Sequence, residues 1–196
     1  MPTFYHDLIT KKSWQTLQNL KRQVDFILIG GWAVWLYTKS LKSKDIDIIV
    51  NYDQLEKLRQ FYPITKNDRL KKYEARNEEV QIDIYLPHYS QIGIPAEEII
   101  KNIQTLETFS VPKIETLLAL KLYVYSQRQL SAKGQKDRLD ILSLLLLTSP
   151  VKLSKELINI IKETTKIPEL NINEHVWSKK KKELLISDRL SFQNRN

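Results

Sequence analysis

The sequence contains no cysteine among its 196 residues, which excludes disulfides, thiolate metal sites and cysteine nucleophiles. Long hydrophobic runs are also missing, because the longest apolar stretch, residues 142–147, is far shorter than the about 18 residues that a membrane-spanning helix requires. The first twelve residues lack the apolar segment of a signal peptide. We therefore expect a cytoplasmic protein with no membrane-spanning segment.

Histidine is scarce, and acidic residues are outnumbered by basic ones. The three histidines, His6, His88 and His175, have no ligand spacing, so we assign them no chemistry. The net charge of +8 and the isoelectric point near 9.4 favour polyanionic partners such as nucleic acid, although lysines also keep surface helices soluble. Four consecutive lysines at 179–182 fit either a solvated helix face or a patch that contacts RNA.

The order of the expected elements places strands early and helices late. Hydrophobic patterning predicts helices over residues 6–22, 31–38 and from about 53, and strands over residues 25–29, 46–50, 70–75, 80–86 and 108–111. The strands 70–75 and 80–86 flank a polar turn and are typical of a hairpin. Pro112 suits the first position of a helix, and from there the pattern predicts helices only. The first runs to about 129, and the others follow over 137–147 after a break at Gly134, over 154–164 and over 174–186. This order predicts an α+β fold with a helical second half.

Three aspartates interrupt two of the apolar strands. Asp45 and Asp47 alternate with isoleucines in the second strand, and Asp83 lies between two isoleucines in a later one. Alternation places Asp45 and Asp47 on one face, and aspartate is unfavourable in strands, so the pair indicates a function more than a simple solvated face. If the two strands are neighbours, three carboxylates converge. Mg²⁺ fits such a patch, since it binds through one or two carboxylates plus substrate phosphates.

A pair of glycines and a basic helix suit phosphate groups. Gly30 and Gly31 join the first strand to a helix, whose free N–H groups can bind phosphate, although most such pairs only turn the chain. Lys121 and Arg128 lie seven residues apart on one helix face, where they either offset phosphate charge or extend to solvent.

The segment from Gly30 to Asp47 resembles the signature of the DNA polymerase beta-like nucleotidyltransferase superfamily, in which two small residues precede two alternating aspartates. The strand around Asp83 is similar to the third-carboxylate strand of that superfamily. The resemblance implies the nucleotidyltransferase fold, a small mixed β-sheet flanked by helices. The change from mixed elements to helices alone places a domain boundary around residues 107–112. We therefore expect a nucleotidyltransferase catalytic domain over residues 1–108 and an α-helical C-terminal domain over residues 109–196.

The residues around these motifs narrow the resemblance. The sequence at 31–33, Gly-Trp-Ala, is similar to that of aminoglycoside- and lincosamide-modifying nucleotidyltransferases and of the AbiEii/AbiGii toxins of abortive infection. Residues 112–145 resemble a block of the toxin group in which a helix lysine precedes an arginine and an Arg/Lys-Asp-x-x-Asp element. The positions that match this block are Lys121, Arg128, Lys136, Asp137 and Asp140.

The resemblance implies an NTP-dependent nucleotidyltransferase that releases pyrophosphate. Two Mg²⁺ (or Mn²⁺) ions would be bound by the catalytic residues Asp45, Asp47 and Asp83. The nucleotide would be bound by Gly30, Gly31, Lys121, Lys136 and Asp137. Asp137 would orient the nearby lysine or help to activate the acceptor; read from the residues alone, it could equally complement a helix dipole.

The acceptor stays open at the level of sequence. RNA, in particular a tRNA 3′ end, fits the basic charge and the toxin-like block, and a toxin would have a cognate antitoxin. A small hydroxylated antibiotic fits the Gly-Trp-Ala variant, and a protein hydroxyl is a third acceptor. A non-catalytic relative and a plain nucleic-acid-binding module are the alternatives to an enzyme, but neither explains three retained aspartates.

Overall fold

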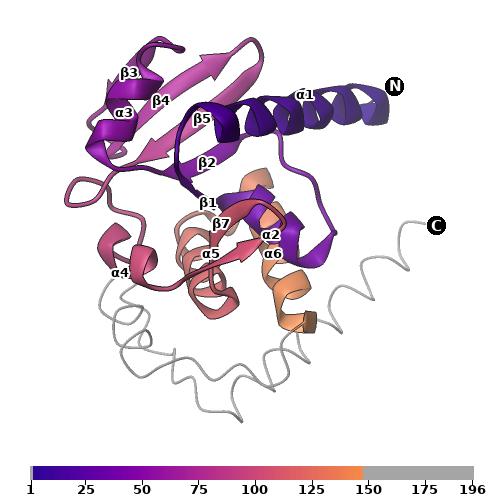
Figure 1. Ribbon diagram of the computed structural model, residues 1–196. Coiled ribbons are helices and arrows are strands. Elements are labelled where there is room, and N and C mark those ends of the chain that lie inside the picture. Colours follow the sequence, from indigo (N-terminus) through magenta and orange to yellow (C-terminus); the bar gives the residue numbers. More distant parts are fainter. Residues whose placement is uncertain (1, 148–196) are drawn as a thin grey trace.

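The computed structural model describes residues 2–147 as a mixed sheet with helices around it (Figure 1). The helices of this range are α1 (Pro2–Gln23), α2 (Gly30–Thr38), α3 (Tyr52–Leu58), α4 (Ala96–Lys101), α5 (Ile114–Arg128) and α6 (Ala132–Leu147). Its strands are β1 (Ile27–Ile29), β2 (Ile46–Ile49), β3 (Ile64–Asn67), β4 (Lys72–Asn77), β5 (Val80–Tyr85), β6 (Ile103–Leu106) and β7 (Phe109–Pro112). The predicted α+β class is confirmed.

The strands form one sheet in the order β3-β4-β5-β2-β1-β7-β6. The pairs β2–β5 and β1–β7 are parallel, and the other pairs are antiparallel. The small mixed sheet flanked by helices is therefore confirmed. No helix within residues 2–147 is long and apolar enough to cross a bilayer.

Alternating isoleucines and leucines build the core of this sheet. Leu28, Ile48, Ile82 and Ile84 are completely buried, as the period-2 pattern of their strands predicts. Helix α1 joins this core through Trp14, whose ring lies 5.0 Å from that of Trp32 in α2 and 5.8 Å from that of Phe109 in β7. The indole N–H of Trp32 donates to Ser13 Oγ at 2.8 Å. Helix α2 is thus fixed to the sheet and to α1 together.

The expected hairpin is confirmed and is tighter than the sequence suggests. Asn77 pairs with Val80, so only Glu78 and Glu79 form the turn, and Glu78 takes a positive φ of 52°. This register places Glu74 of β4 directly opposite Asp83 of β5.

Two boundaries in the helical part differ from the sequence prediction. Pro112 ends β7 instead of opening a helix, and α5 begins at Ile114. Gly134 does not break a helix, because it lies inside α6. Its amide donates to Ser131 Oγ at 3.0 Å, which is the bond of an N-cap serine. A Cβ on Gly134 would lie 2.1 Å from the carbonyl oxygen of Arg128, so glycine permits the close turn between α5 and α6.

Helix α6 packs against α5 and α2, and Figure 1 shows the three side by side beneath the sheet. The strand β7 follows the expected domain boundary at residue 108 and lies between β1 and β6 of the sheet. The helices expected over 154–164 and 174–186, and the lysines at 179–182, lie outside the described residues. The division into 1–108 and 109–196 therefore stays a prediction.

Candidate active site

The strands that carry the aspartates are direct neighbours. In the parallel pair β2–β5, Asp47 lies opposite Asp83, and in the antiparallel pair β1–β2, Ile29 lies opposite Asp47. The chain therefore brings the two carboxylates together beside the residue that precedes Gly30. This is the convergence that the alternation of the two strands predicts once the strands are adjacent.

Gly30 brings the N-terminus of α2 against this carboxylate pair. Its φ is +68°, and an added Cβ would lie 2.1 Å from Asp47 Oδ2. A side chain is excluded at this position by both the backbone conformation and the space. A Cβ on Gly31 would lie 2.7 Å from Ser43 Oγ and 3.1 Å from Lys136 Nζ. Both glycines thus keep the start of the helix open to the groups around it.

Asp47 binds its proton more tightly than an ordinary aspartate. Its removal from water, together with the negative charge of Asp83, raises the pKa to about 6, although Lys121 acts in the opposite direction. A partly buried carboxylate beside a second one, with a perturbed pKa, is a recognised signature of a functional site. Any cation bound here would stabilise the ionised form.

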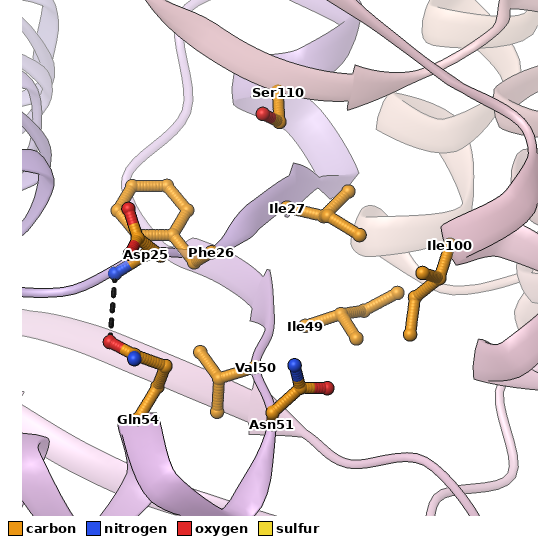
Figure 2. Close-up of a pocket in the computed structure, with 9 residues that line it drawn as sticks. All are labelled: Asp25, Phe26, Ile27, Ile49, Val50, Asn51, Gln54, Ile100 and Ser110. Carbon is orange, nitrogen blue, oxygen red and sulfur yellow. Dashed lines mark hydrogen bonds between the residues drawn. The ribbon is translucent and has the colours of Figure 1, made fainter.

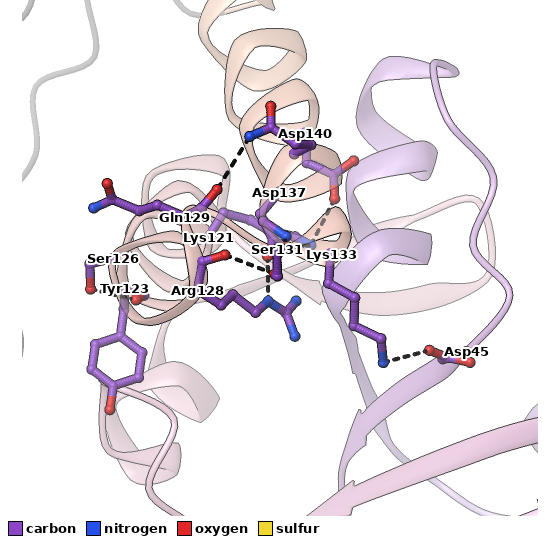
Figure 3. A network of polar contacts seen from close by, with 12 residues as sticks. Asp45, Lys121, Tyr123, Ser126, Arg128, Gln129, Ser131, Lys133, Asp137 and Asp140 are labelled. Carbon is purple, nitrogen blue, oxygen red and sulfur yellow. Dashed lines mark hydrogen bonds and ion pairs between the residues drawn. The ribbon is translucent and has the colours of Figure 1, made fainter.

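Asp45 lies just before β2 and is the most accessible of the three aspartates. Its side chain is 44% exposed, and Oδ2 lies 3.6 Å from Nζ of Lys133, which extends from α6 (Figure 3). Two residues before Asp47, it offers a second oxygen donor at the same end of the strand.

Asp83 differs from the other two aspartates because both of its oxygens have protein partners. Gln81 Nε2 donates to Oδ1 at 2.8 Å, and Lys72 Nζ donates to Oδ2 at 2.6 Å. Lys72 also contacts Glu74 Oε1 at 2.9 Å, and its side chain is only 9% exposed. Burial lowers the pKa of Lys72, but the bonds to Asp83 and Glu74 outweigh it and raise the pKa overall.

Lys72 was not among the site residues predicted from the sequence, although the hairpin contains the signal for it. Given the two-residue turn, Glu74 faces Asp83, and Lys72 lies two residues further along the same face of the sheet. Diagonal neighbours on adjacent strands are within reach of long side chains.

The predicted residues of α5 and α6 form a buried ionic network (Figure 3). Lys121 Nζ lies 3.2 Å from Asp137 Oδ1 and 2.7 Å from Asp140 Oδ2, and Arg128 Nε lies 2.7 Å from Asp137 Oδ2. Burial lowers the pKa of Lys121, but the two aspartates outweigh this effect and raise it. Two cations and two anions balance here, so the network links α5 to α6 with no surplus charge.

Lys136, also on α6, contacts a serine hydroxyl next to the start of α2 instead of the carboxylates of this network. Its Nζ donates to Ser43 Oγ at 3.1 Å and lies at the position where a Cβ of Gly31 would come within 3.1 Å. Burial lowers the pKa of Lys136, even though Asp140, Asp47 and Asp45 act to raise it. The start of α2 and the ammonium of Lys136 therefore offer positive potential beside the carboxylates.

The carboxylate oxygens of the three aspartates suit a hard cation such as Mg²⁺ only in part. Within residues 2–147, no three carboxylate or imidazole side chains are grouped as a ready metal site. Asp45 and Asp47 fit the one or two carboxylates that Mg²⁺ uses together with substrate phosphates. Asp83 does not have a free oxygen to add to them.

A separate cavity of about 270 Å³ lies at the opposite ends of the same strands (Figure 2). Its lining combines apolar and polar residues: Asp25, Phe26, Ile27, Ile49, Val50, Asn51, Gln54, Ile100 and Ser110. In its wall, the amide of Asp25 donates to Gln54 Oε1 at 3.0 Å. None of the predicted site residues lines this cavity.

No protein-family model matches the sequence, and no curated protein matches it significantly. Among solved structures, an antigenic nucleotidyltransferase-like protein from Paracoccidioides brasiliensis is similar at 18% identity and a TM-score of 0.45, over 84% of this chain and 90% of that one. JHP933 from Helicobacter pylori is similar at 17% identity and a TM-score of 0.48, over 94% of both chains. The antibiotic-resistance factor ANT(2'')-Ia is similar at 13% identity and a TM-score of 0.48, over 85% of this chain and 93% of that one. At these values the function has to be argued from the residues of the site itself.

Proposed function

We propose that the chain is a metal-dependent nucleotidyltransferase of the DNA polymerase beta-like superfamily, which transfers a nucleoside monophosphate from an NTP to a hydroxyl acceptor. The observation that carries this proposal is the register of Asp47 opposite Asp83, with Gly30 packed against Asp47. Two carboxylates and an open helix N-terminus in one place suit a metal-bound polyphosphate.

Asp45 and Asp47 would hold a Mg²⁺ or Mn²⁺ ion that the triphosphate shares. When bound, this ion supplies Lewis-acid stabilisation of the charge that develops on the phosphate oxygens. It would also keep Asp47 ionised, against the burial that raises the pKa of that carboxyl to about 6. This pair of ligands follows from the donor chemistry of the two residues.

The triphosphate would lie against the start of α2, where Gly30 and Gly31 leave the backbone N–H groups accessible. Lys136 is the cation best placed to contact it, because its ammonium has a hydroxyl partner, Ser43, next to Gly31. Lys121 would act on the triphosphate only indirectly, since its charge is already matched by Asp137 and Asp140. Asp137 would then orient Lys121 for the nucleotide site.

In the reaction, the acceptor oxygen would form a bond to the α-phosphorus while the bond from that phosphorus to the bridging α–β oxygen breaks. Pyrophosphate leaves with the electron pair of the broken bond, as in other in-line phosphoryl-type displacements. The proton of the acceptor hydroxyl would pass to Asp83, the carboxylate next to Asp47 that Lys72 and Gln81 hold in place.

The acceptor that we favour is RNA, such as a tRNA 3′ end. The net charge of +8 and the resemblance of residues 112–145 to the AbiEii/AbiGii toxin block support this choice. The role would then be that of a toxin in a toxin–antitoxin or abortive-infection system, with a cognate antitoxin and ATP or another NTP as donor. Because these substrates are found in the cytoplasm, the reaction would take place there.

The experiment is the transfer of label from each of the four α-labelled NTPs to total RNA in the presence of Mg²⁺. We expect RNA to be labelled by the wild-type chain and not by Asp47→Asn. Label on an added aminoglycoside or lincosamide, with RNA left unlabelled, would keep nucleotidyl transfer and replace the toxin role by antibiotic modification. Label on a protein would assign the third acceptor.

Calorimetry of NTP binding tests the metal requirement separately. We expect weak binding in EDTA and clear binding with Mg²⁺ or Mn²⁺, because the carboxylates repel a bare triphosphate. Lys136→Met should weaken the metal-dependent binding by about 1.5–3 kcal/mol, the range for a hydrogen bond to a charged group. Equal affinity with and without metal would contradict the proposal.

A further inference from the structure

We propose that Lys72 serves as a built-in cation beside Asp83, so that the site takes one divalent ion per chain, at Asp45 and Asp47, and not two. The proposal rests on the proposed function and deepens it. Lys72 is a positioning residue in it, because it acts through Asp83.

Both carboxylate oxygens of Asp83 already have protein partners. Lys72 Nζ lies 2.6 Å from Oδ2, and Gln81 Nε2 lies 2.8 Å from Oδ1. A carboxylate has two oxygens, and in Asp83 each already accepts a strong hydrogen bond. A metal ion at Asp83 would have to share an oxygen with the ammonium of Lys72.

Lys72 is held in place by its burial, by its contact with Glu74 and by the pairing of its strand. Its side chain is 9% exposed, and the same ammonium contacts Glu74 at 2.9 Å, which in turn accepts a bond from Asn67 Nδ2 at 3.0 Å. The strand β4 is paired on both sides, with β3 and β5, so its backbone cannot swing away. Lys72 therefore has no ready route to solvent that would free Asp83.

The positive charge of Lys72 also opposes a divalent ion at Asp83. A divalent ion and an ammonium within a few ångströms repel each other, and the repulsion grows as water is excluded. Separating Lys72 from Asp83 to admit the ion would leave the buried ammonium with Glu74 as its remaining partner among the described residues, which is unfavourable. The ammonium already supplies positive charge at Asp83, as a second ion would, and it fixes the carboxylate next to Asp47.

The stoichiometry of Mn²⁺ binding tests the proposal without measuring activity. The free Mn²⁺ is followed by electron paramagnetic resonance in the presence of a non-hydrolysable α,β-methylene NTP. We expect one tightly bound Mn²⁺ per wild-type chain. Lys72→Met should gain a second, because it frees Asp83, and Lys66→Met should stay at one. Lys66 is the matched control, a half-exposed lysine on the adjacent strand β3.

Asp83→Asn gives a second reading that does not depend on the folding of Lys72→Met. We expect this variant to keep one Mn²⁺ per chain. If Lys72→Met does not fold, the double variant K72M/E74Q removes the carboxylate charge of Glu74 together with the cation that it contacts, and it is measured in its place.

Two tight Mn²⁺ ions in the wild-type chain, one of them lost in Asp83→Asn, would overturn the proposal. So would a folded Lys72→Met or K72M/E74Q that stays at one ion. Failure of the proposed function looks different, because Asp47→Asn would then bind as much Mn²⁺ as the wild-type chain, or the wild-type chain would bind none.

Discussion

At the scale of single residues, the surroundings of Asp47 destabilise the ionised form of its carboxyl group. Its pKa is raised from 3.8 to about 6, so the folded chain binds this proton more tightly than the unfolded chain. As the pH rises through the range from about 4 to 6, the unfolded state loses the proton first, and the native state loses stability. The site therefore carries a folding cost at neutral pH that a bound cation would offset.

Removal of this charge should stabilise the metal-free protein. We predict that Asp47→Asn raises the free energy of unfolding at neutral pH by about 3 kcal/mol, because the pKa shift of Asp47 is converted at about 1.4 kcal/mol per pKa unit. Near pH 4 the difference should disappear, because Asp47 is protonated in the folded wild-type chain. The measurement is urea denaturation in EDTA at both pH values.

Asp45→Asn is the control for this measurement, since the Asp45 side chain is 44% exposed and its charge remains solvated. We expect little change in stability for it at either pH. An Asp47→Asn variant less stable than the wild-type chain at neutral pH would show that Asp47 is a structural ion-pair partner instead.

At the scale of helices, the turn from α5 to α6 depends on the buried network around Lys121. Asp137 and Asp140 are buried, with exposed fractions of 2% and 0%. Lys121→Met would remove the cation that contacts Asp140 and would leave Asp137 with Arg128 alone. We predict a loss of about 3–5 kcal/mol in the free energy of unfolding, the usual cost of removing one partner of a buried pair.

Lys136→Met should behave in the opposite way, with little loss of stability and a clear loss of NTP affinity, because Lys136 contacts a hydroxyl and lies beside Gly31. Denaturation and calorimetry on both variants separate the two roles. If Lys121→Met lowered only NTP affinity, the network would be a binding site and not a link between helices.

The elements also show what the sequence could predict. Alternation placed Asp45, Asp47 and the isoleucines on opposite faces, and the structure confirms that Asp47 and Asp83 meet. Short or exposed elements were missed, since β3, α4 and β6 have only four to six residues each and too few apolar positions to show a period.

Tertiary contacts explain the remaining misses. Gly134 suggested a break, but the carbonyl of Arg128 packs so closely against it that glycine is needed inside α6. The pairing of Lys72 with Asp83 depends on the exact length of the turn between β4 and β5. A shift of one residue would move Lys72 to the other face of the sheet.

At the scale of the whole molecule, the net charge of +8 bears on the acceptor. Neutralisation of the four lysines at 179–182 to glutamine should weaken RNA binding and make its dependence on salt shallower. The slope should fall by up to about 3, because each single-strand phosphate contact contributes about 0.7. The measurement is fluorescence anisotropy of labelled RNA over a range of salt concentrations.

NTP affinity of the same variant is the control and should not change, because the candidate active site is formed by residues 30–140. An unchanged affinity for RNA and an unchanged salt slope would assign the four lysines to a solvated surface. RNA binding, if present, would then have to rest on other lysines of the chain.

The most direct measurement compares α-labelled and γ-labelled NTP in parallel reactions. Both reactions contain Mg²⁺ and the acceptor that the labelling experiment identifies. With α-labelled NTP, we expect the label on the acceptor, and with γ-labelled NTP, we expect it only in released pyrophosphate. Asp45→Asn and Asp47→Asn should abolish both products while the variants remain folded. Label from the γ-phosphate on the acceptor, or undiminished transfer by folded Asp47→Asn, would contradict nucleotidyl transfer at this site.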